Sequence, residues 1–182
     1  MSEKLKTLQD LLMFELKDLY SAEEQLLKAL PKMAEKASNA KLRQAFEEHL
    51  EQTEMQKDRL DQVAEIMKFD ISGETCKAMK GLVAEGKEIM GEDAEEEVMD
   101  QALIAAAQKA EHYEIASYGT VTHYAEILGL NQVYELLAET LDEEKKADKK
   151  LNRIAKEEQK EESNTLKTRT KATSRSTSKS NA

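Results

Sequence analysis

Apolar residues recur every three or four positions through four long stretches of this sequence, and almost nothing in those stretches interrupts a helix. The chain of 182 residues contains one proline and six glycines, and 35% of its residues are charged. A repeat of three to four residues is that of a helix with one buried face, whereas a strand alternates every two residues. The pattern therefore predicts an all-α protein whose long helices carry charged outer surfaces.

The first two long helices are predicted to form a hairpin. One apolar row runs through residues 3–37 and another through residues 42–67, and Ser38 and Asn39 separate them. So short a connection leaves no room for the chain to cross the fold. The two helices should therefore lie antiparallel and side by side.

A second hairpin is predicted after a longer connection. Residues 69–75 have no helical repeat and lead into a short amphipathic crossover helix over 76–90, and Asp93 is placed to cap the next long helix. That helix should reach a turn at residues 129–131, which leads into a fourth long helix ending near Lys160. Two antiparallel helix hairpins joined by one long connection are the ferritin-like form of the four-helix bundle.

Residues 1–160 are predicted to form one domain and residues 161–182 a disordered basic tail. The tail is rich in Ser and Thr, and it has too few large apolar side chains to offset the entropy lost on ordering. Residues 1–162 contain 22 Lys and Arg against 37 Asp and Glu, so the body is acidic and should repel nucleic acid. We expect any contact with nucleic acid to be weak and confined to the tail.

The sequence predicts a cytoplasmic protein without a membrane-inserted segment. Its single cysteine, Cys76, excludes an internal disulfide framework and is better explained as a packed thiol than as a nucleophile. Residues 1–15 lack the basic and then apolar pattern of a secretion signal. The longest apolar clusters fall well short of the roughly 20 residues that cross a bilayer.

Polar residues interrupt each apolar row near its middle. Several ionised carboxylates in one interior repel one another, so they must be protonated, paired with cations or bound to metal. Arg59 and the lysines lie mostly off the inward rows, which makes metal the simplest compensation. The interrupting residues are Glu23 in the first helix, His49, Thr53 and Gln56 in the second, Glu111 and Glu114 in the third, and Glu144 and Asp148 in the fourth.

Residues equidistant from the turn near Leu130 should face each other, which pairs Glu114 with Glu144 and Glu111 with Asp148. Carboxylates with one imidazole favour iron or manganese as the metal. The predicted ligands are Glu23, His49, Glu111, Glu114, Glu144 and Asp148, with a dinuclear centre as one option.

Two simpler explanations of these polar residues stay open. The carboxylates could occupy wet positions at the rim of a loosely packed face, as inward charges in amphipathic helices commonly do. His49 could be a hydrogen-bonded core histidine instead of a ligand. His112 and His123 fall beside the inward row and are predicted to be interface or surface groups.

Four segments closely resemble the bacterial YciE/YciF-like stress proteins. They are DLYSAE at 18–23, ALPK at 29–32, QALIAAAQKAEHYEIASYGT at 101–120 and ETLDEE at 139–144. The resemblance covers roughly residues 5–156. It implies a ferritin-like fold, a role in stress responses and a homodimer.

The sequence departs from the ligand pattern of known di-iron sites of ferritin-like proteins. Those sites use a lone glutamate on each of two helices and Glu-x-x-His on each of the other two. Here the corresponding pairs are Thr53 with Gln56, Glu111 with Glu114, and Glu144 with Ala147. No complete di-iron motif is present, so the sequence leaves open whether the protein is an enzyme.

Two functions are therefore predicted. The first is a stress-related protein that binds iron or manganese inside a ferritin-like bundle. The alternative is a non-catalytic structural or interaction dimer, in which the buried carboxylates form a hydrogen-bonded network. Tyr20, Tyr113 and Tyr118 are candidate donors to such a network.

Overall fold

The computed structural model describes the backbone of residues 5–177 and the side chains of residues 5–157. This part of the chain forms five helices and no strand, which confirms the all-α prediction. The helices are α1 (Leu8–Lys36), α2 (Ala40–Met67), α3 (Lys77–Met90), α4 (Glu96–Ile127) and α5 (Asn131–Thr177).

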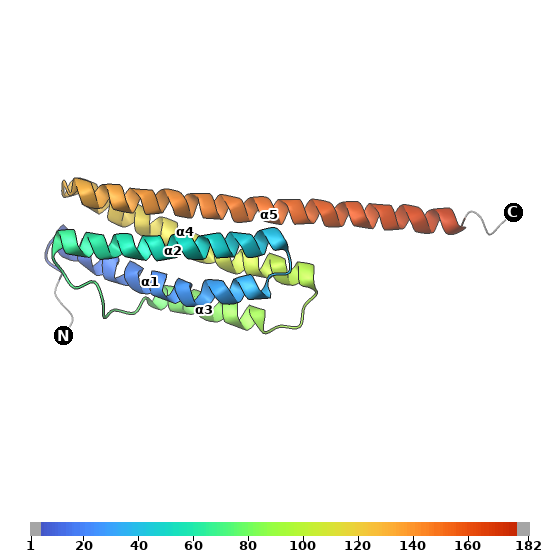
Figure 1. Cartoon of the computed structure of the whole chain (residues 1–182), viewed down its shortest axis with the longest axis horizontal. Helices are drawn as coiled ribbons and strands as arrows, with labels where there is room; N and C mark the ends of the chain where they lie inside the picture. The colour runs from blue at the N-terminus through green and yellow to red at the C-terminus, as the bar shows by residue number, and fades with distance from the viewer. Residues whose placement is uncertain (1–4, 178–182) are drawn as a thin grey trace.

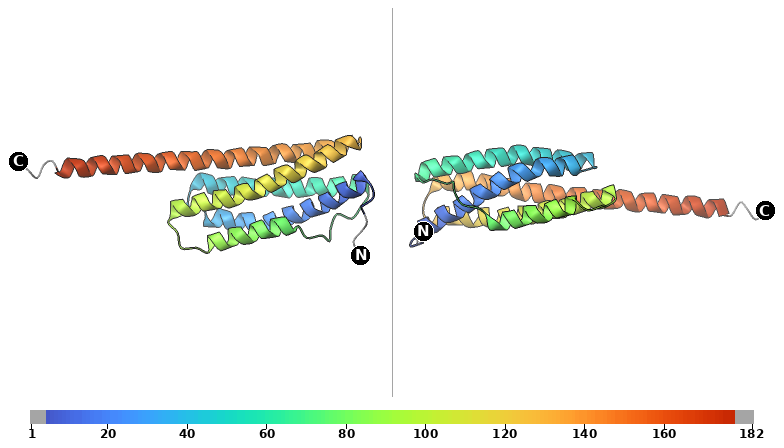
Figure 2. Two further views of the ribbon diagram at one scale, coloured as in Figure 1. Left: turned by 180° about the vertical axis from the view of Figure 1, so that it is seen from behind. Right: turned by 90° about the horizontal axis from the view of Figure 1, so that it is seen from below.

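The long helices run as two antiparallel pairs. Figure 1 shows α1 and α2 joined by a short turn at one end of the molecule, and α4 and α5 joined by a short turn at the other. The shorter helix α3 lies between these pairs in the chain, and it packs against α1 and α4 on the outside of the molecule (Figure 2). Both turns lie where the sequence places them.

The helix starts follow local capping chemistry. Thr7 and Asp10 form a capping box, so α1 begins at Leu8 and not at residue 3. The Asn39 side chain accepts hydrogen bonds from the backbone N–H groups of Lys41 and Leu42 at the start of α2. The predicted Asp93 cap is wrong, because Glu95 occupies the N-cap position of α4 and makes no side-chain cap bond.

The last helix is longer than the sequence predicts. The backbone of α5 remains helical to Thr177, so the end predicted near Lys160 is wrong. Figure 1 shows this helix extending well past the ends of the others. Residues 178–182 of the predicted tail lie outside the described residues, and the domain boundary at residue 160 stays a prediction.

Two apolar clusters fill the core, with a polar layer between them. One contains Leu30, Phe46 and Leu103, and the other contains Leu16, Leu60 and Val121. Along every long helix the chain passes from one cluster to the other through buried polar residues. The buried side chains of this layer are Glu23, His49, Thr53, Gln56, Glu111, Glu114, Thr140 and Glu144.

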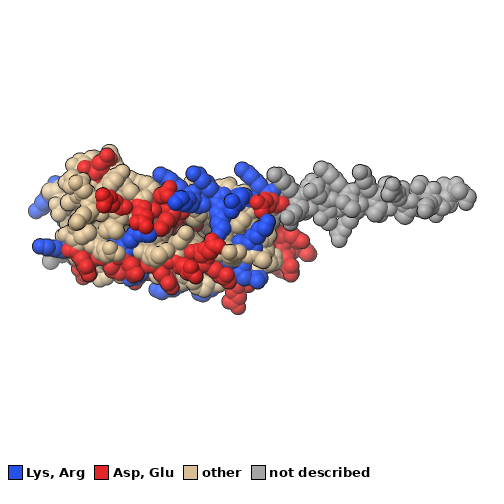
Figure 3. All heavy atoms as spheres, turned by 45° about the horizontal axis from the view of Figure 1, so that its top comes forward, with Lys and Arg blue, Asp and Glu red and all other residues tan. Residues whose placement is uncertain are grey.

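The outer surface is strongly charged. In the view of Figure 3, acidic side chains predominate along the lower part of the molecule, and basic side chains gather along the upper part. Among the described residues, no helix combines the length and the hydropathy that crossing a bilayer requires.

A buried carboxylate that the sequence did not single out fixes the turn between α1 and α2. Asp100 of α4 is 2% exposed. Its carboxylate accepts hydrogen bonds from the backbone N–H of Ser38 at 2.9 Å, from that of Asn39 at 2.8 Å, and from the Ser38 hydroxyl. One side chain therefore ties the first hairpin to the second.

We predict that Asp100→Ala lowers the free energy of unfolding by roughly 2 to 3 kcal/mol, because it removes the buried carboxylate that accepts three hydrogen bonds from Ser38 and Asn39. The matched control is Asp93→Ala, which alters an exposed aspartate just before the same helix and should stay within about 0.5 kcal/mol of wild type. Urea denaturation of both variants measures the difference. Equal effects would show that the turn does not depend on Asp100.

Candidate metal centre

Three helices bring four ionisable side chains together in the polar layer. His49 comes from α2, Glu111 and Glu114 come from α4, and Glu144 comes from α5. All four are buried, and each offers one ligand atom such that these atoms lie within 4.8 Å of one another. The rim explanation is therefore wrong for these residues, which are at most 6% exposed.

The histidine stands between two of the carboxylates. Its Nε2 lies 3.2 Å from Glu111 Oε1 and 3.9 Å from Glu144 Oε2. Several other polar atoms of the cluster have no hydrogen bond among the described residues. His49 Nδ1, Glu111 Oε2 and both carboxylate oxygens of Glu114 and Glu144 are buried without a hydrogen-bond partner among the described residues.

Glu23 of α1 borders the four-residue cluster. It is fully buried, and its Oε1 accepts a hydrogen bond from the Tyr118 hydroxyl, while Oε2 is buried without a partner among the described residues. Its charge acts on both Glu114 and Glu144. Glu23 therefore brings a buried carboxylate from α1, the remaining long helix, to the edge of the cluster.

Asp148, the sixth predicted ligand, lies outside the cluster. Its carboxylate accepts hydrogen bonds from Gln108 at 3.0 Å and from Asn152 at 3.2 Å, and its side chain is 17% exposed. The exposed His112 approaches the same carboxylate at 3.5 Å. Glu111 contacts His49 and not Asp148. The predicted pairing of Glu111 with Asp148 is therefore not observed.

Burial sets the protonation of these carboxyl groups. It raises the pKa of Glu111 to about 8, and the neighbouring Glu144 carboxyl partly offsets that rise. Burial also raises the pKa values of Glu23 and Glu114 well above the ordinary 4.5, and the charge of Glu144 adds to both shifts. Burial likewise raises the pKa of Glu144, with His49 acting in the opposite direction. When no metal is bound, burial in this layer therefore favours the protonated form of each of these carboxyl groups.

A cation close to the layer was missed by sequence reasoning, which placed Arg59 off the inward row. The Arg59 side chain is 11% exposed and binds Glu143 through both terminal nitrogens, at 2.7 and 2.8 Å. Gln56 also donates to Glu143, at 3.1 Å. The sequence does contain a signal for this contact. Arg59 follows the inward residue Gln56 by three positions, and Glu143 directly precedes the inward residue Glu144.

The three tyrosines meet different partners. Tyr118 donates to Glu23, and Tyr113 donates to Asp18, as predicted for donors in a carboxylate network. The Tyr20 ring instead lies under the Lys57 ammonium, 4.5 Å from its centroid. Cys76 is fully buried, 3.1 Å from the Tyr113 hydroxyl, and burial raises the pKa of its thiol, which fits a packed thiol.

The cluster has the chemistry of a site for a hard divalent cation. Carboxylate oxygens with one imidazole nitrogen suit iron or manganese, and thiolate is absent from the four-residue set. Buried polar atoms without partners are rare in folded proteins and call for an explanation. A bound ion would give these oxygens and the imidazole a partner that the described part of the chain does not supply.

Comparison with known proteins gives a consistent assignment. Protein YciF of Escherichia coli (strain K12) is 51% identical over 142 residues, which are 78% of this chain and 86% of the relative. The crystal structure of the E. coli stress protein YciF matches with a TM-score of 0.82 and 50% identity, covering 85% of this chain and 98% of the other.

A second solved structure has nearly the same agreement. YcfI from Rhodopseudomonas palustris, described as a candidate structural protein, matches with a TM-score of 0.80 and 47% identity over 84% of this chain and 97% of the other. The family model described as domain of unknown function DUF892 matches residues 7–164. This chain is thus a homologue of the YciF stress protein and belongs to the DUF892 family.

Proposed function

We propose that this protein is a stress-related, ferritin-like metal-binding protein whose interior cluster holds iron or manganese. The observation that carries the proposal is the convergence of His49, Glu111, Glu114 and Glu144, all buried, with ligand atoms within 4.8 Å of one another. Glu23 is proposed as a fifth ligand. A cytoplasmic homodimer belongs to the same proposal and rests on the resemblance to the stress-protein family.

The charge of the layer supports a divalent ion. Glu23, Glu111, Glu114 and Glu144 would carry four negative charges if ionised, while the nearby Arg59 is already paired with Glu143 and Glu139. Two divalent ions would neutralise the four carboxylates, and one ion would leave protons on some of them. Metal content per chain therefore distinguishes a mononuclear from a dinuclear centre.

A bound iron or manganese ion would supply Lewis-acid or redox chemistry to this layer. The residues themselves define its surroundings. Thr53 and Gln56 continue the inward row of α2, where one of the two Glu-x-x-His motifs of a di-iron protein would stand. The two apolar clusters of the core lie on either side of the layer along the bundle.

A structural function without metal is the second candidate. Two observations favour it: the description of the R. palustris relative as a candidate structural protein, and the hydrogen bond from Tyr118 to Glu23. In that case protons take the place of the ion, and neighbouring carboxyl groups share them. The raised pKa values of Glu23, Glu111, Glu114 and Glu144 are compatible with this state.

We predict that protein purified without chelator contains iron or manganese at about one to two ions per chain. Adding Mn(II) or Fe(II) to metal-free protein should raise its melting temperature. An ion that binds only the folded state at about 100 times its Kd stabilises that state by roughly 2.7 kcal/mol. Glu144→Gln should abolish both the metal content and the stabilisation, because it removes a charged ligand from the centre of the cluster.

The matched control for this experiment is Glu135→Gln, an exposed glutamate on the same helix, which should behave as wild type. Metal analysis by mass spectrometry and thermal melts with and without Mn(II) give the two readouts. Wild-type protein that contains no metal and melts identically across a wide range of Mn(II) and Fe(II) concentrations would establish the structural alternative.

We predict that the metal-free protein loses stability as pH rises from about 5 to about 8. The folded-state pKa of Glu111 is raised from 4.5 to about 8, so the folded state binds this proton more tightly than the unfolded chain does. Its stabilising contribution is complete below pH 4.5 and is lost as pH rises through about 8. Each such proton changes the free energy of unfolding by up to about 1.4 kcal/mol per pH unit.

Urea melts in the presence of chelator, repeated across this pH range, measure the slope. Glu111→Gln should reduce the slope, since the amide cannot titrate, and Glu135→Gln should leave it unchanged. A slope that is the same in Glu111→Gln and wild type would mean that the general repulsion of an acidic chain, and not this layer, causes the pH dependence.

A further inference from the structure

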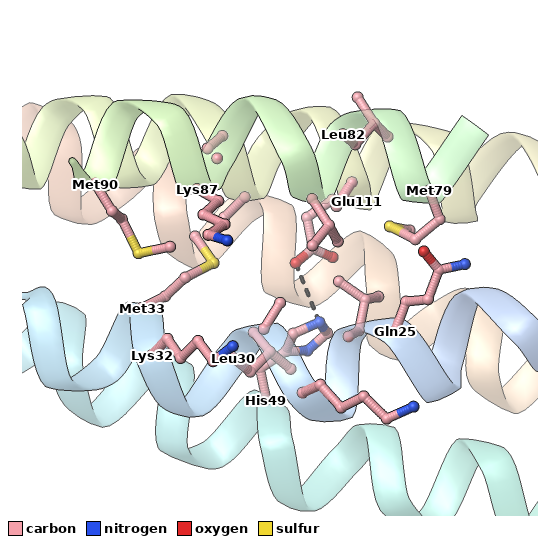
Figure 4. A pocket seen from close by; sticks show the side chains of 18 residues that line it. Gln25, Leu30, Lys32, Met33, His49, Met79, Leu82, Lys87, Met90 and Glu111 are labelled. Atoms are coloured by element: carbon pink, nitrogen blue, oxygen red, sulfur yellow. Dashed lines mark ion pairs between the residues drawn. The ribbon is translucent and has the colours of Figure 1, made fainter. Parts of the chain in front are cut away.

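An apolar pocket leads from the surface to the carboxylate layer. It lies between α1, α3 and α4, has a volume of about 130 Å³, and includes His49 and Glu111 in its lining. Figure 4 shows these two side chains facing each other at the centre of the pocket, with Met33 and Met90 towards one end and Met79 and Gln25 towards the other. The crossover helix α3 forms one wall, so the pocket depends on the long connection between the two hairpins.

The walls of the pocket are apolar. Leu26, Leu30 and Met33 come from α1, and Met79, Leu82 and Val83 come from α3. On the α4 side the wall consists of the small side chains Ala106, Ala107 and Ala110, and opposite Ala106 stands Gly86. Small residues on facing helices leave the space that larger side chains would fill.

Three lysines stand around this apolar space. Lys28 and Lys32 of α1 and Lys87 of α3 line the pocket and are exposed to solvent. Lys32 and Lys87 extend from facing helices in Figure 4. None of the three has an ion pair among the described side chains. Three cations without ion pairs around one apolar opening, in a chain of net charge -10, would attract an anionic group.

We propose that this pocket binds a small anionic amphiphile, an apolar molecule of about six carbons that carries a carboxylate. An apolar cavity of roughly 150 Å³ holds a molecule the size of benzene, so a pocket of about 130 Å³ accommodates a chain of similar carbon number. The apolar part lies against the methionine and leucine side chains and reaches towards His49 and Glu111. The carboxylate lies among Lys28, Lys32 and Lys87.

This inference goes beyond the proposed metal centre and does not require it. Binding depends on the apolar walls and on the lysines, which belong to the pocket and not to the ligand set. If the centre also holds metal, the pocket places an organic molecule next to two of its ligands. Binding to metal-free protein separates the two ideas, because either can fail while the other holds.

The test uses hexanoate and its neutral analogue hexan-1-ol as probes on full-length protein, both metal-free and loaded with Mn(II). Binding is followed by isothermal titration calorimetry and by ligand-observed NMR. We expect both probes to bind metal-free protein and hexanoate to bind more tightly, with the difference shrinking at high salt because exposed charges are screened. Failure of both probes to bind wild-type protein would overturn the proposal.

One substitution fills the pocket without weakening the helix. A Cβ at Gly86 would meet only Ala106 Cβ, at 3.7 Å, and replacing glycine inside a helix raises helix propensity. Gly86→Leu should therefore fold and lower the affinity for both probes by about tenfold or more, roughly 1.4 kcal/mol. Gly81→Leu is the matched control on the same helix, where a Cβ meets nothing within 4 Å, and it should bind as wild type.

The lysines are tested separately from the apolar walls. Replacing Lys28, Lys32 and Lys87 together by Gln should weaken hexanoate binding severalfold and leave hexan-1-ol unchanged, whereas Lys80→Gln, an exposed lysine outside the pocket, should change neither. Unchanged binding of both probes by Gly86→Leu would show that they bind elsewhere. Equal affinity for hexanoate and hexan-1-ol in wild type and in the triple variant would overturn the anionic part of the proposal.

Discussion

The packing of this bundle depends on four carboxyl groups that are buried in one layer. Glu23, Glu111, Glu114 and Glu144 are each at most 2% exposed, and they come from three of the long helices. Isolated charges in such a place would cost far more free energy than a small domain can spare, so each group must hold a proton or meet a cation. The long helices can therefore close around this layer only in particular protonation or ligand states.

The layer also organises the packing. It divides the apolar interior into two clusters, and the helices pass from one to the other through the same polar level. The surrounding contacts keep the acids in place: Tyr118 binds Glu23, while Arg59 and Gln56 hold Glu143 beside Glu144. Apolar side chains at these positions would avoid the cost of burying carboxyl groups, so the layer is not what stability alone would favour.

The position of α3 adds a second consequence of the same architecture. A direct turn between the hairpins would leave the outer side of α1 and α4 bare, whereas the crossover helix covers it with Met79, Leu82 and Val83. The cover is incomplete at Gly86 and at the alanines of α4, and the remaining space reaches His49 and Glu111. On the α3 side of the molecule, the space next to the buried layer is therefore lined mainly by apolar side chains.

Much of the site was predictable because helices repeat regularly. Once a row of three-and-four spacing is identified, the residues that interrupt it are known to face inward, and this placed Glu23, His49, Glu111, Glu114 and Glu144 in the interior. The facing of Glu114 and Glu144 followed from a tight turn near Leu130. Asp148 failed as a member of the cluster because its rim position lets Gln108 and Asn152 compete for its carboxylate.

The sequence by itself determined the helical class, the two hairpins and the inward acids, since these depend on local periodicity and short connections. Only the tertiary structure decided which acids meet His49, that Asp100 holds the first turn, that Arg59 binds Glu143, and that a pocket lies under α3. These features depend on the relative rotation and spacing of helices that are far apart in the chain. Side chains packed across several interfaces set that rotation together, and no single helix encodes it.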